Sequence, residues 1–519
     1  MRQKKLELNG NKLKIRDLHS MIADEKITVE IPDSVLSVIE KSHTFLLQEL
    51  DKRIIYGSNT GFGPMASHVL GRKQLSELQK NLILSHAVGM GEAIRPEYVL
   101  ATMVVRLNSL TKGFSGVSVE LIKHLATFIN HRILPVVPEH GAVGASGDLV
   151  QLAHIALALL GKGQVFYKGE KHSASKILRK LGLKPYTLLP KEGLSLINGT
   201  SAMTGIGSLV YLDASRLLSL AIHTGALALE LVKGFNDSIS EKLNALRPHP
   251  GQIQIAKRLR EILASSKLLR DRRKLKNFTS EKEHEIPETV QEIYSLRCIP
   301  QILGPVLETL LQTGKVLETE MNSVTDNPIV DWEGKLFLHG GNFHGDEIAA
   351  SLDQLKMVLV KMTMLSERRI NFFLNKNINK YFPPFLNLRT PGLTLGLQGL
   401  QFVATSTTAQ SQSLAFPNYV HSIPTNGDNQ DLVSMGSDSS LLAAKVIDNA
   451  YVVLAIELIT LAQAVDFLGG SKKFSTESKK LFATVRKIIP KIEDDRVLVA
   501  ELDSIVKFLK NNEPDEFRY

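Results

Sequence analysis

Apolar residues recur mainly at helical spacing along the chain, and in several long segments this spacing persists from end to end. Four such segments are residues 200–234, 301–322, 345–374 and 439–468. Helices of this length without sustained heptads are typical of a large bundle rather than a coiled coil. Strand-like pieces are short and lie at residues 164–168 and 335–338. The pattern therefore predicts an all-α fold, a long central helical bundle with small β insertions.

The sequence shows neither an internal repeat nor a flexible linker. Residues 183–192 contain two prolines, which is typical of a connection between an N-terminal region and the bundle. We therefore predict three regions. They are an N-terminal domain at residues 1–190, a central long-helix bundle at 191–471 and a peripheral helical region at 472–519.

Composition indicates a soluble globular protein, because 43% of the 519 residues are hydrophobic and 22% are charged. The basic residues after Met1 are not followed by the apolar core of a secretory signal. No stretch offers the ~18 uninterrupted apolar residues of a membrane helix. Cys298 is the only cysteine, which excludes an internal disulfide and a multi-cysteine metal site. We expect a cytoplasmic protein without a membrane partner or a metal.

The net charge of +9 raises the possibility of a nucleic-acid partner. The densest basic run is residues 267–276, which has no aromatic residue before Phe278 and is followed by mixed charges at 281–285. Surfaces that bind single strands interleave aromatic and basic residues. The run therefore indicates a solvated helix end and loop, and we expect no nucleic-acid partner.

One stretch of small residues, Gly141-Ala-Val-Gly-Ala-Ser-Gly-Asp-Leu-Val150, carries unusual chemistry. The nitrogen of Gly147 can fold back toward the carbonyl of Ala145, since glycine has the required backbone freedom. If that nitrogen attacks the carbonyl carbon and two waters leave, the segment becomes a 5-methylidene-imidazol-4-one. Ser146 then carries an exocyclic methylidene, an electrophile made without an external cofactor. The alternative is a simple turn before a helix.

Six further motifs are rich in glycine, polar or aromatic residues, and each alone is typical of a loop or a core histidine. They are residues 55–64 with Tyr56 and Gly63, 81–91 with Ser85 and His86, 193–200 with Asn198, 294–297 with Tyr294 and Arg297, 322–328 with Asn327, and 426–434 with Asn429 and Gln430.

Together the seven motifs resemble those of the aromatic amino acid ammonia-lyases, in family order and from about residue 27 to 490. The tyrosine ammonia-lyases of Flavobacterium-type bacteria share the Tyr-Gly-x-Asn-Thr-Gly-Phe-Gly-Pro-Met, Ser-His and Tyr-Ser-Leu-Arg-Cys motifs. The resemblance implies an all-α fold of the fumarase/aspartase-like superfamily. It also implies that Ala145, Ser146 and Gly147 cyclise, and that a homotetramer forms with each active site built from three subunits.

The resemblance also implies a role for each motif residue. Tyr56 would be the base that removes the β-proton, Tyr294 would lie near the electrophile, and Asn198 would support the ring or the substrate amine. Arg297 would bind the substrate carboxylate, because a guanidinium can grip both oxygens. The remaining contacts would be made by Gly63, which allows close approach, by Asn327, Asn429 and Gln430, and by Ser85 and His86 at the distal end of the side chain.

The substrate depends on His86 and Gln430. Phenylalanine offers a buried histidine no hydrogen-bond partner and is the weakest candidate. Histidine ammonia-lyases typically have Gln-Glu-Asp-His-Val-Ser-Met where this chain has Asn429-Gln-Asp-Leu-Val-Ser-Met435. An amide in place of the glutamate suits a phenol, so we predict that L-tyrosine is converted to trans-p-coumarate. The alternatives are a histidine ammonia-lyase that forms urocanate, an aromatic aminomutase and, in a different class, a non-catalytic scaffold.

Overall fold

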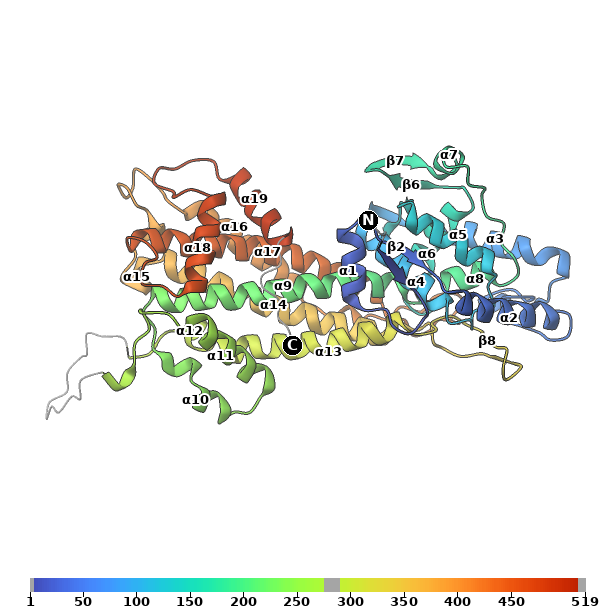
Figure 1. Cartoon of the computed structure of the whole chain (residues 1–519), viewed down its shortest axis with the longest axis horizontal. Coiled ribbons are helices and arrows are strands. Elements are labelled where there is room, and N and C mark those ends of the chain that lie inside the picture. Colours follow the sequence, from blue (N-terminus) through green and yellow to red (C-terminus); the bar gives the residue numbers. More distant parts are fainter. Residues whose placement is uncertain (1–3, 275–289, 512–519) are drawn as a thin grey trace. The chain divides into compact units, whose positions relative to one another are not determined.

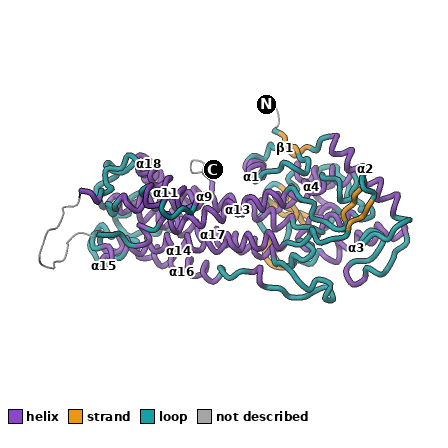
Figure 2. The backbone as a smooth tube through the Cα atoms, turned by 90° about the horizontal axis from the view of Figure 1, so that it is seen from below, coloured by secondary structure: helices purple, strands orange, loops and turns teal. Residues whose placement is uncertain are grey.

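The computed structural model describes residues 4–274 and 290–511, and helices make up most of them (Figures 1 and 2). The prediction of an all-α fold with small β insertions is confirmed. The chain divides into two compact units. The first unit comprises Met1–Leu212, Gln312–Gln354 and Pro417–Ala444, and the second comprises Asp213–Leu311, Leu355–Phe416 and Lys445–Tyr519. The predicted three regions along the sequence stay a prediction.

Four long helices match the four predicted ones to within three residues at every end. They are α9 (Ser201–Leu231), α13 (Ile299–Met321), α14 (Asp346–Leu374) and α17 (Gly436–Phe467). The boundary between the two units falls inside each of them. Each long helix therefore contributes one end to the first unit and the other end to the second.

The first unit contains most of the shorter elements (Figure 1). Its helices are α1 (Ile15–Ala23), α2 (Asp33–Glu49), α3 (Leu75–His86), α4 (Pro96–Leu110), α5 (Val119–Asn130), α6 (Leu149–Leu159), α7 (Ala174–Lys180) and α8 (Glu192–Ile197). Its strands are β1 (Lys5–Glu7), β2 (Thr28–Glu30), β3 (Met90–Ala93), β4 (Leu134–Pro135), β5 (Pro138–His140), β6 (Gln164–Tyr167), β7 (Glu170–Ser173), β8 (Ile329–Asp331) and β9 (Leu336–Leu338).

Helix α4 forms the centre of the first unit and is buried from Tyr98 to Leu110. Pro96 occupies its first turn, where the missing N–H of proline costs no helical hydrogen bond. Helices α1 and α5 and strand β4 pack against it. Helix α5 begins with a cap, because the Ser118 hydroxyl accepts from the Leu121 N–H at 3.2 Å.

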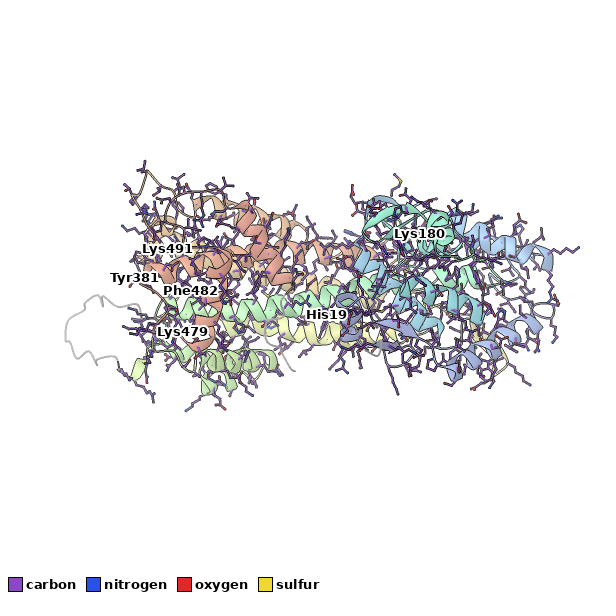
Figure 3. All side chains as sticks on the ribbon, turned by 45° about the horizontal axis from the view of Figure 1, so that its top comes forward. His19, Lys180, Tyr381, Lys479, Phe482 and Lys491 are labelled. Atoms are coloured by element: carbon purple, nitrogen blue, oxygen red, sulfur yellow. The ribbon has the colours of Figure 1, made fainter. Side chains whose placement is uncertain are left out.

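The strands form only small sheets. β1 pairs with β2 in parallel, whereas β3 with β5, β4 with β6, β6 with β7 and β8 with β9 are antiparallel. The predicted strand pieces correspond to β6 and β9. After the β6–β7 hairpin, the ammonium of Lys180, labelled in Figure 3, lies 5.6 Å from the centroid of the Tyr167 ring.

The second unit is helical in its described part. Besides the ends of the long helices it contains α10 (Glu241–Ala245), α11 (Pro250–Leu263), α12 (Tyr294–Arg297), α15 (Lys376–Asn379), α16 (Gln398–Ser413), α18 (Thr476–Ile488) and α19 (Val499–Asn511). The predicted C-terminal helical stretch corresponds to α18 and α19.

The basic run is more structured than the predicted solvated loop. The guanidinium groups of Arg270 and Arg272 lie 4.0 and 4.2 Å from the centroid of the Phe235 ring, and both side chains are half-buried. Stacking on an aromatic ring occupies the guanidinium faces on which a nucleic-acid base would otherwise stack. Residues 275–276, Phe278 and the mixed segment 281–285 lie outside the described residues.

Two helices, α9 and α17, are long and apolar enough to cross a membrane by length and composition. In each of them, however, most of the apolar window is buried inside the fold, 72% in α9 and 83% in α17. Such burial is typical of core helices, which explains their composition without a bilayer.

Candidate active site

A cavity of about 740 Å³ lies in the first unit and falls within the size range of small-molecule sites. Ten of the thirteen predicted site residues line it. They are Tyr56, Gly63, Ser85, His86, Ser146, Gly147, Asn198, Asn327, Asn429 and Gln430. Ala145 is buried directly beside the cavity wall, and the two others, Tyr294 and Arg297, belong to the second unit.

The predicted tripeptide folds back on itself at the cavity wall. Gly147 makes isolated backbone pairings with Gly144, Ala145 and Gly199. Its φ of +72° is in the left-handed region, and a Cβ placed on it overlaps with the backbone of Gly199. Both constraints favour glycine, and the pairing with Ala145 shows that the backbone doubles back within the tripeptide. The chain therefore provides the bent backbone that the predicted cyclisation requires.

Asn198 holds the Ser146 carbonyl from the end of α8. Its Nδ2 donates to the Ser146 carbonyl oxygen at 3.0 Å, and its Oδ1 accepts from the Asn327 N–H at 2.8 Å. The Asn327 side chain in turn accepts from the Gly340 N–H at 2.9 Å. Because both ends of the Asn198 amide are used, its orientation is fixed and its N–H is aimed at the tripeptide.

Gln430, which is 284 residues away in the sequence, contacts the hydroxyl of the same serine. Its Nε2 donates to the Ser146 hydroxyl oxygen at 2.8 Å. The loop that carries it is closed by two backbone bonds between Thr425 and Gln430, of 3.0 and 3.3 Å. Asn426 and Gly427 adopt positive φ values of 55° and 60°, which is typical of a tight Asn-Gly turn. The turn chemistry of this motif therefore places Gln430 in the cavity.

The N-termini of four helices meet the loop that contains the tripeptide. Helix α6 begins two residues after Gly147, and α9 begins two residues after Gly199. The residues that immediately precede α14 and α17 donate backbone bonds to the carbonyls of Gly144 and Val143, at 3.1 and 3.0 Å. Helix N-termini carry partial positive charge. Their convergence favours negative charge near the tripeptide, on a substrate carboxylate or a deprotonated base.

Tyr56 and Gly63 are joined by a hydrogen bond, since the Gly63 N–H donates to the phenolic oxygen at 2.9 Å. Such a donor stabilises the oxygen when it carries negative charge. Gly63 has a φ of +53°, and a Cβ placed there would lie 2.6 Å from the Asn426 amide nitrogen. Its missing side chain therefore makes room for the 425–430 loop, an additional reason for glycine beside the predicted approach to substrate.

His86 ends α3, and its ring orientation is set by the helix. Its Nδ1 lies 2.9 Å from the Leu82 carbonyl oxygen, which also accepts from the Ser85 hydroxyl at 3.0 Å. The Ser85 hydroxyl oxygen also lies 3.0 Å from His86 Nδ1, so the donor and acceptor roles here depend on the tautomer of the ring. In the tautomer with its proton on Nδ1, the ring donates to the Leu82 carbonyl. In the neutral ring Nε2 is then an acceptor. Ser85 thus contacts its histidine neighbour directly, and in this tautomer His86 presents an acceptor to the cavity that it lines.

A buried ion pair supports the floor of the site. Lys191 and Asp326 are almost completely buried, and Lys191 Nζ donates at 2.9 Å to the Asp326 carboxylate, the Ser115 carbonyl and the Ser195 hydroxyl. Burial lowers the pKa of Lys191, whereas Asp326 opposes that change. All three ammonium hydrogens are used, so the ion pair is well satisfied. It anchors the residue that precedes Asn327 and thereby the partner of Asn198.

Asp148 is a buried residue that the sequence analysis missed. Its carboxylate accepts from the backbone N–H groups of Ala202 and Met203 at 2.7 and 3.0 Å and from the Ser437 hydroxyl. Burial raises the pKa of Asp148 to about 6, although these donors and Arg106 oppose the rise. It ties the tripeptide to the first turn of α9. Its place directly after Gly147 was a signal that could have identified it.

The apolar wall of the cavity was also missed. Phe62, Leu82, Leu194 and Phe343 line it, as does Asn426. Phe62, Leu82 and Leu194 lie within the motifs at 55–64, 81–91 and 193–200, but the last two are apolar residues of helices and resemble core residues in a sequence. Phe343 lies in the glycine-rich segment 340–345. These side chains provide a surface on which a planar substrate ring can pack.

Tyr294 and Arg297 do not line the cavity. Both lie in α12 of the second unit, where the Arg297 guanidinium is 4.9 Å from the Tyr294 ring centroid. The Tyr294 side chain is 69% exposed. Arg297 Nε is buried without a hydrogen-bond partner in the described structure. The residues that line the cavity of the first unit thus include the electrophile segment and the candidate base, whereas the predicted carboxylate clamp belongs to the second unit.

A family model described as "Aromatic amino acid lyase" matches residues 13–487. The chain belongs to the aromatic amino acid lyase family. The prediction from the motifs is thereby confirmed at the level of the family, and the protein is an enzyme of the carbon–nitrogen lyase class.

This aromatic amino acid lyase is similar to enzymes with several activities. It is 39% identical over 510 residues to the histidine ammonia-lyase of Halalkalibacterium halodurans, covering 98% of this chain and 96% of the relative. It is also 39% identical over 505 residues to that of Bacillus subtilis, covering 97% and 96%. The solved tyrosine aminomutase from Streptomyces globisporus superposes with a TM-score of 0.92 at 35% identity, covering 98% and 97%.

Proposed function

We propose that the protein is an ammonia-lyase acting on an L-α-amino acid whose ring carries a hydrogen-bond donor, with L-histidine as the first candidate. The observation that carries this proposal is the bent Ala145–Gly147 backbone, with Asn198 on its carbonyl and Tyr56 in the same cavity. An electrophile and a base are the two groups that an elimination of ammonia needs.

The residues around the tripeptide fit the cyclised group that the family resemblance implies. Gly147 has the required backbone conformation, and the donor from Asn198 suits the carbonyl oxygen of such a ring. When formed, the group supplies an electron-poor carbon that captures the substrate amine and makes it a better leaving group. No external cofactor is part of the proposal.

Residues of the chain itself remove the proton, bind the substrate and exclude water. The phenolic oxygen of Tyr56 removes the β-proton, and the Gly63 N–H stabilises the charge that this oxygen carries. The converging helix N-termini favour the carboxylate of the bound substrate. Phe62, Leu194 and Phe343 exclude water from the ring of the substrate.

The choice of substrate depends on what faces His86. With its proton on Nδ1, the ring has an acceptor at Nε2 that suits the N–H of an imidazole or the O–H of a phenol, whereas phenylalanine offers neither. The relatives named histidine ammonia-lyases support histidine better than tyrosine, which the sequence motif favoured. L-Tyrosine stays the second candidate, because Gln430 carries an amide where histidine ammonia-lyases typically carry glutamate.

An incubation of the purified enzyme with L-histidine, L-tyrosine and L-phenylalanine in turn tests this proposal. We expect urocanate from histidine as the main product, measured by its ultraviolet absorbance. Coumarate as the main product would instead establish tyrosine as the substrate. If none of the three amino acids yields an unsaturated acid, the lyase proposal is wrong.

An aminomutase is the second candidate activity, supported by the likeness to tyrosine aminomutase structures. Such an enzyme returns ammonia to the β-carbon instead of releasing it. Chromatography of the same reactions separates α- from β-amino acids. Accumulation of the β-amino acid would favour the aminomutase, and free ammonia in step with the unsaturated acid favours the lyase.

We further propose a homotetramer in which neighbouring copies complete each site. Tyr294 and Arg297 belong to the second unit and are not among the residues that line the cavity of the first, and we assign their supply to a neighbouring copy. Large apolar side chains are exposed in both units, which supports association. They include Val420, Ile423 and Leu432 in the first unit and Phe402 and Phe416 in the second.

Complementation between two inactive variants tests the shared site. Tyr56→Phe and Arg297→Leu should each be nearly inactive, and their co-expression should restore part of the activity, because some sites then combine an intact Tyr56 with an intact Arg297. The double variant expressed alone is the control and should stay inactive. A co-expressed sample no more active than its parents would show that each site lies within one copy.

The proposal includes no membrane or nucleic-acid partner and places the enzyme in the cytoplasm. The single cysteine, Cys298, and the engagement of Arg270 and Arg272 with Phe235 support it. A non-catalytic scaffold is disfavoured, since Ser146, the electrophile precursor, is retained.

A further inference from the structure

Both the carbonyl and the hydroxyl of Ser146 accept a hydrogen bond in the uncyclised chain. Asn198 Nδ2 donates to its carbonyl oxygen at 3.0 Å, and Gln430 Nε2 donates to its hydroxyl oxygen at 2.8 Å. The carbonyl lies beside the Cα hydrogen, and the hydroxyl is on Cβ. The two donors therefore contact the two groups whose electrons shift when a serine loses water.

We propose that Gln430 assists the formation of the electrophile by binding the departing hydroxyl of Ser146. This inference rests on the proposed function, because it presumes that the tripeptide cyclises. It gives Gln430 a role in maturation in addition to substrate binding.

The chemistry of maturation balances without another reactant. The Gly147 nitrogen bonds to the Ala145 carbonyl carbon, and that carbonyl oxygen leaves as water with the hydrogens of the Gly147 and Ser146 nitrogens. Ser146 then loses its Cα hydrogen and its Oγ hydroxyl as a second water, and a Cα–Cβ double bond remains. Nothing is oxidised or reduced.

The two amides act on opposite ends of the second loss of water. The Asn198 donor polarises the Ser146 carbonyl and makes the neighbouring Cα hydrogen easier to remove as a proton. The Gln430 donor stabilises the negative charge that grows on Oγ as the Cβ–Oγ bond breaks. The Gln430 amide keeps its own hydrogen, and the departing hydroxyl takes up the proton lost from Cα.

The backbone of Gln430 is held independently of the tripeptide. The closed turn from Thr425 to Gln430 is held by its own backbone bonds, and its residues Asn426 and Gly427 use the conformations that such turns prefer. A donor on a backbone that is already in place needs to order only its side chain, which lowers the cost of reorganisation when charge develops. Once Oγ has left, the amide has lost that partner and becomes available to a ligand in the cavity.

Mass spectrometry of the peptide that spans residues 141–150 tests the inference, and ultraviolet absorbance of the folded protein gives a second readout. In the wild-type protein this peptide should lack the mass of two waters. In Gln430→Leu the second loss should be about tenfold slower, as expected for one missing hydrogen-bond donor. In freshly purified variant, part of the peptide should then have its full mass or a mass reduced by only one water.

Gln48→Leu, the same change at an exposed position of α2, is the matched control and should mature like the wild type. Gln430→Glu keeps the size of the side chain and donates only when protonated. Its maturation should therefore speed up as the pH falls, which also covers the case in which Gln430→Leu does not fold. Maturation of both variants at the wild-type rate, without pH dependence, would overturn the inference. A wild-type peptide of full mass would instead overturn the proposed function.

Discussion

Replacing Ser146 with alanine is expected to lower kcat by at least about 10³-fold, because alanine has no hydroxyl to lose and no methylidene can form. The Ala145 and Gly147 backbone is unchanged, so the variant should fold and associate like the wild type. Its tripeptide can lose one water at most. The measurements are steady-state turnover, the mass of the 141–150 peptide and sedimentation.

Ser37→Ala provides the control, since Ser37 is exposed on α2 and the chemical change is identical. It should keep both the activity and the two-water mass difference. Retained activity in Ser146→Ala would remove the cyclised electrophile from the mechanism. An unfolded Ser146→Ala sample, seen by circular dichroism, would contradict the expectation that the serine serves chemistry rather than folding.

Replacing Tyr56 with phenylalanine should lower kcat by about 10²- to 10⁴-fold, the usual contribution of a positioned general base. The ring stays in place, edge-on to Phe62 with 6.4 Å between the centroids, so the cavity should keep its shape. KM should change much less than kcat. Unlike Ser146→Ala, this variant should show the full loss of two waters, because Tyr56 acts on the substrate.

Tyr167→Phe is the matched control, because Tyr167 lies in β6 and does not line the cavity. Its turnover should equal that of the wild type. A Tyr56→Phe enzyme with nearly normal kcat would assign the proton transfer to another group. A Tyr56→Phe peptide that retains the mass of the waters would place Tyr56 in maturation instead of turnover.

Several features of the fold and site could be predicted locally. The four long helices follow from apolar residues at helical spacing, and α9, α13, α14 and α17 end within three residues of the predicted limits. The turn chemistry of Asn426 and Gly427 likewise predicts the loop that presents Gln430. Such features depend on neighbours a few residues away, which a sequence displays directly.

Other features depend on residues far apart in the chain. The pairing of Lys191 with Asp326 could not be predicted, because a buried lysine in a sequence resembles an exposed one. In the apolar wall of the cavity, Leu82 and Leu194 are helix residues that look like ordinary core positions. Which apolar side chains face a cavity instead of a core depends on how the helices pack.

The sequence by itself determined the helices, the tripeptide that can cyclise and the family, because each is written in short stretches of residues. Only the tertiary structure decided that Asn198 contacts the carbonyl of Ser146 and that Gln430 contacts its hydroxyl. The physical reason is distance along the chain. Ser146 and Gln430 are 284 residues apart, and packing alone places their atoms within hydrogen-bonding reach.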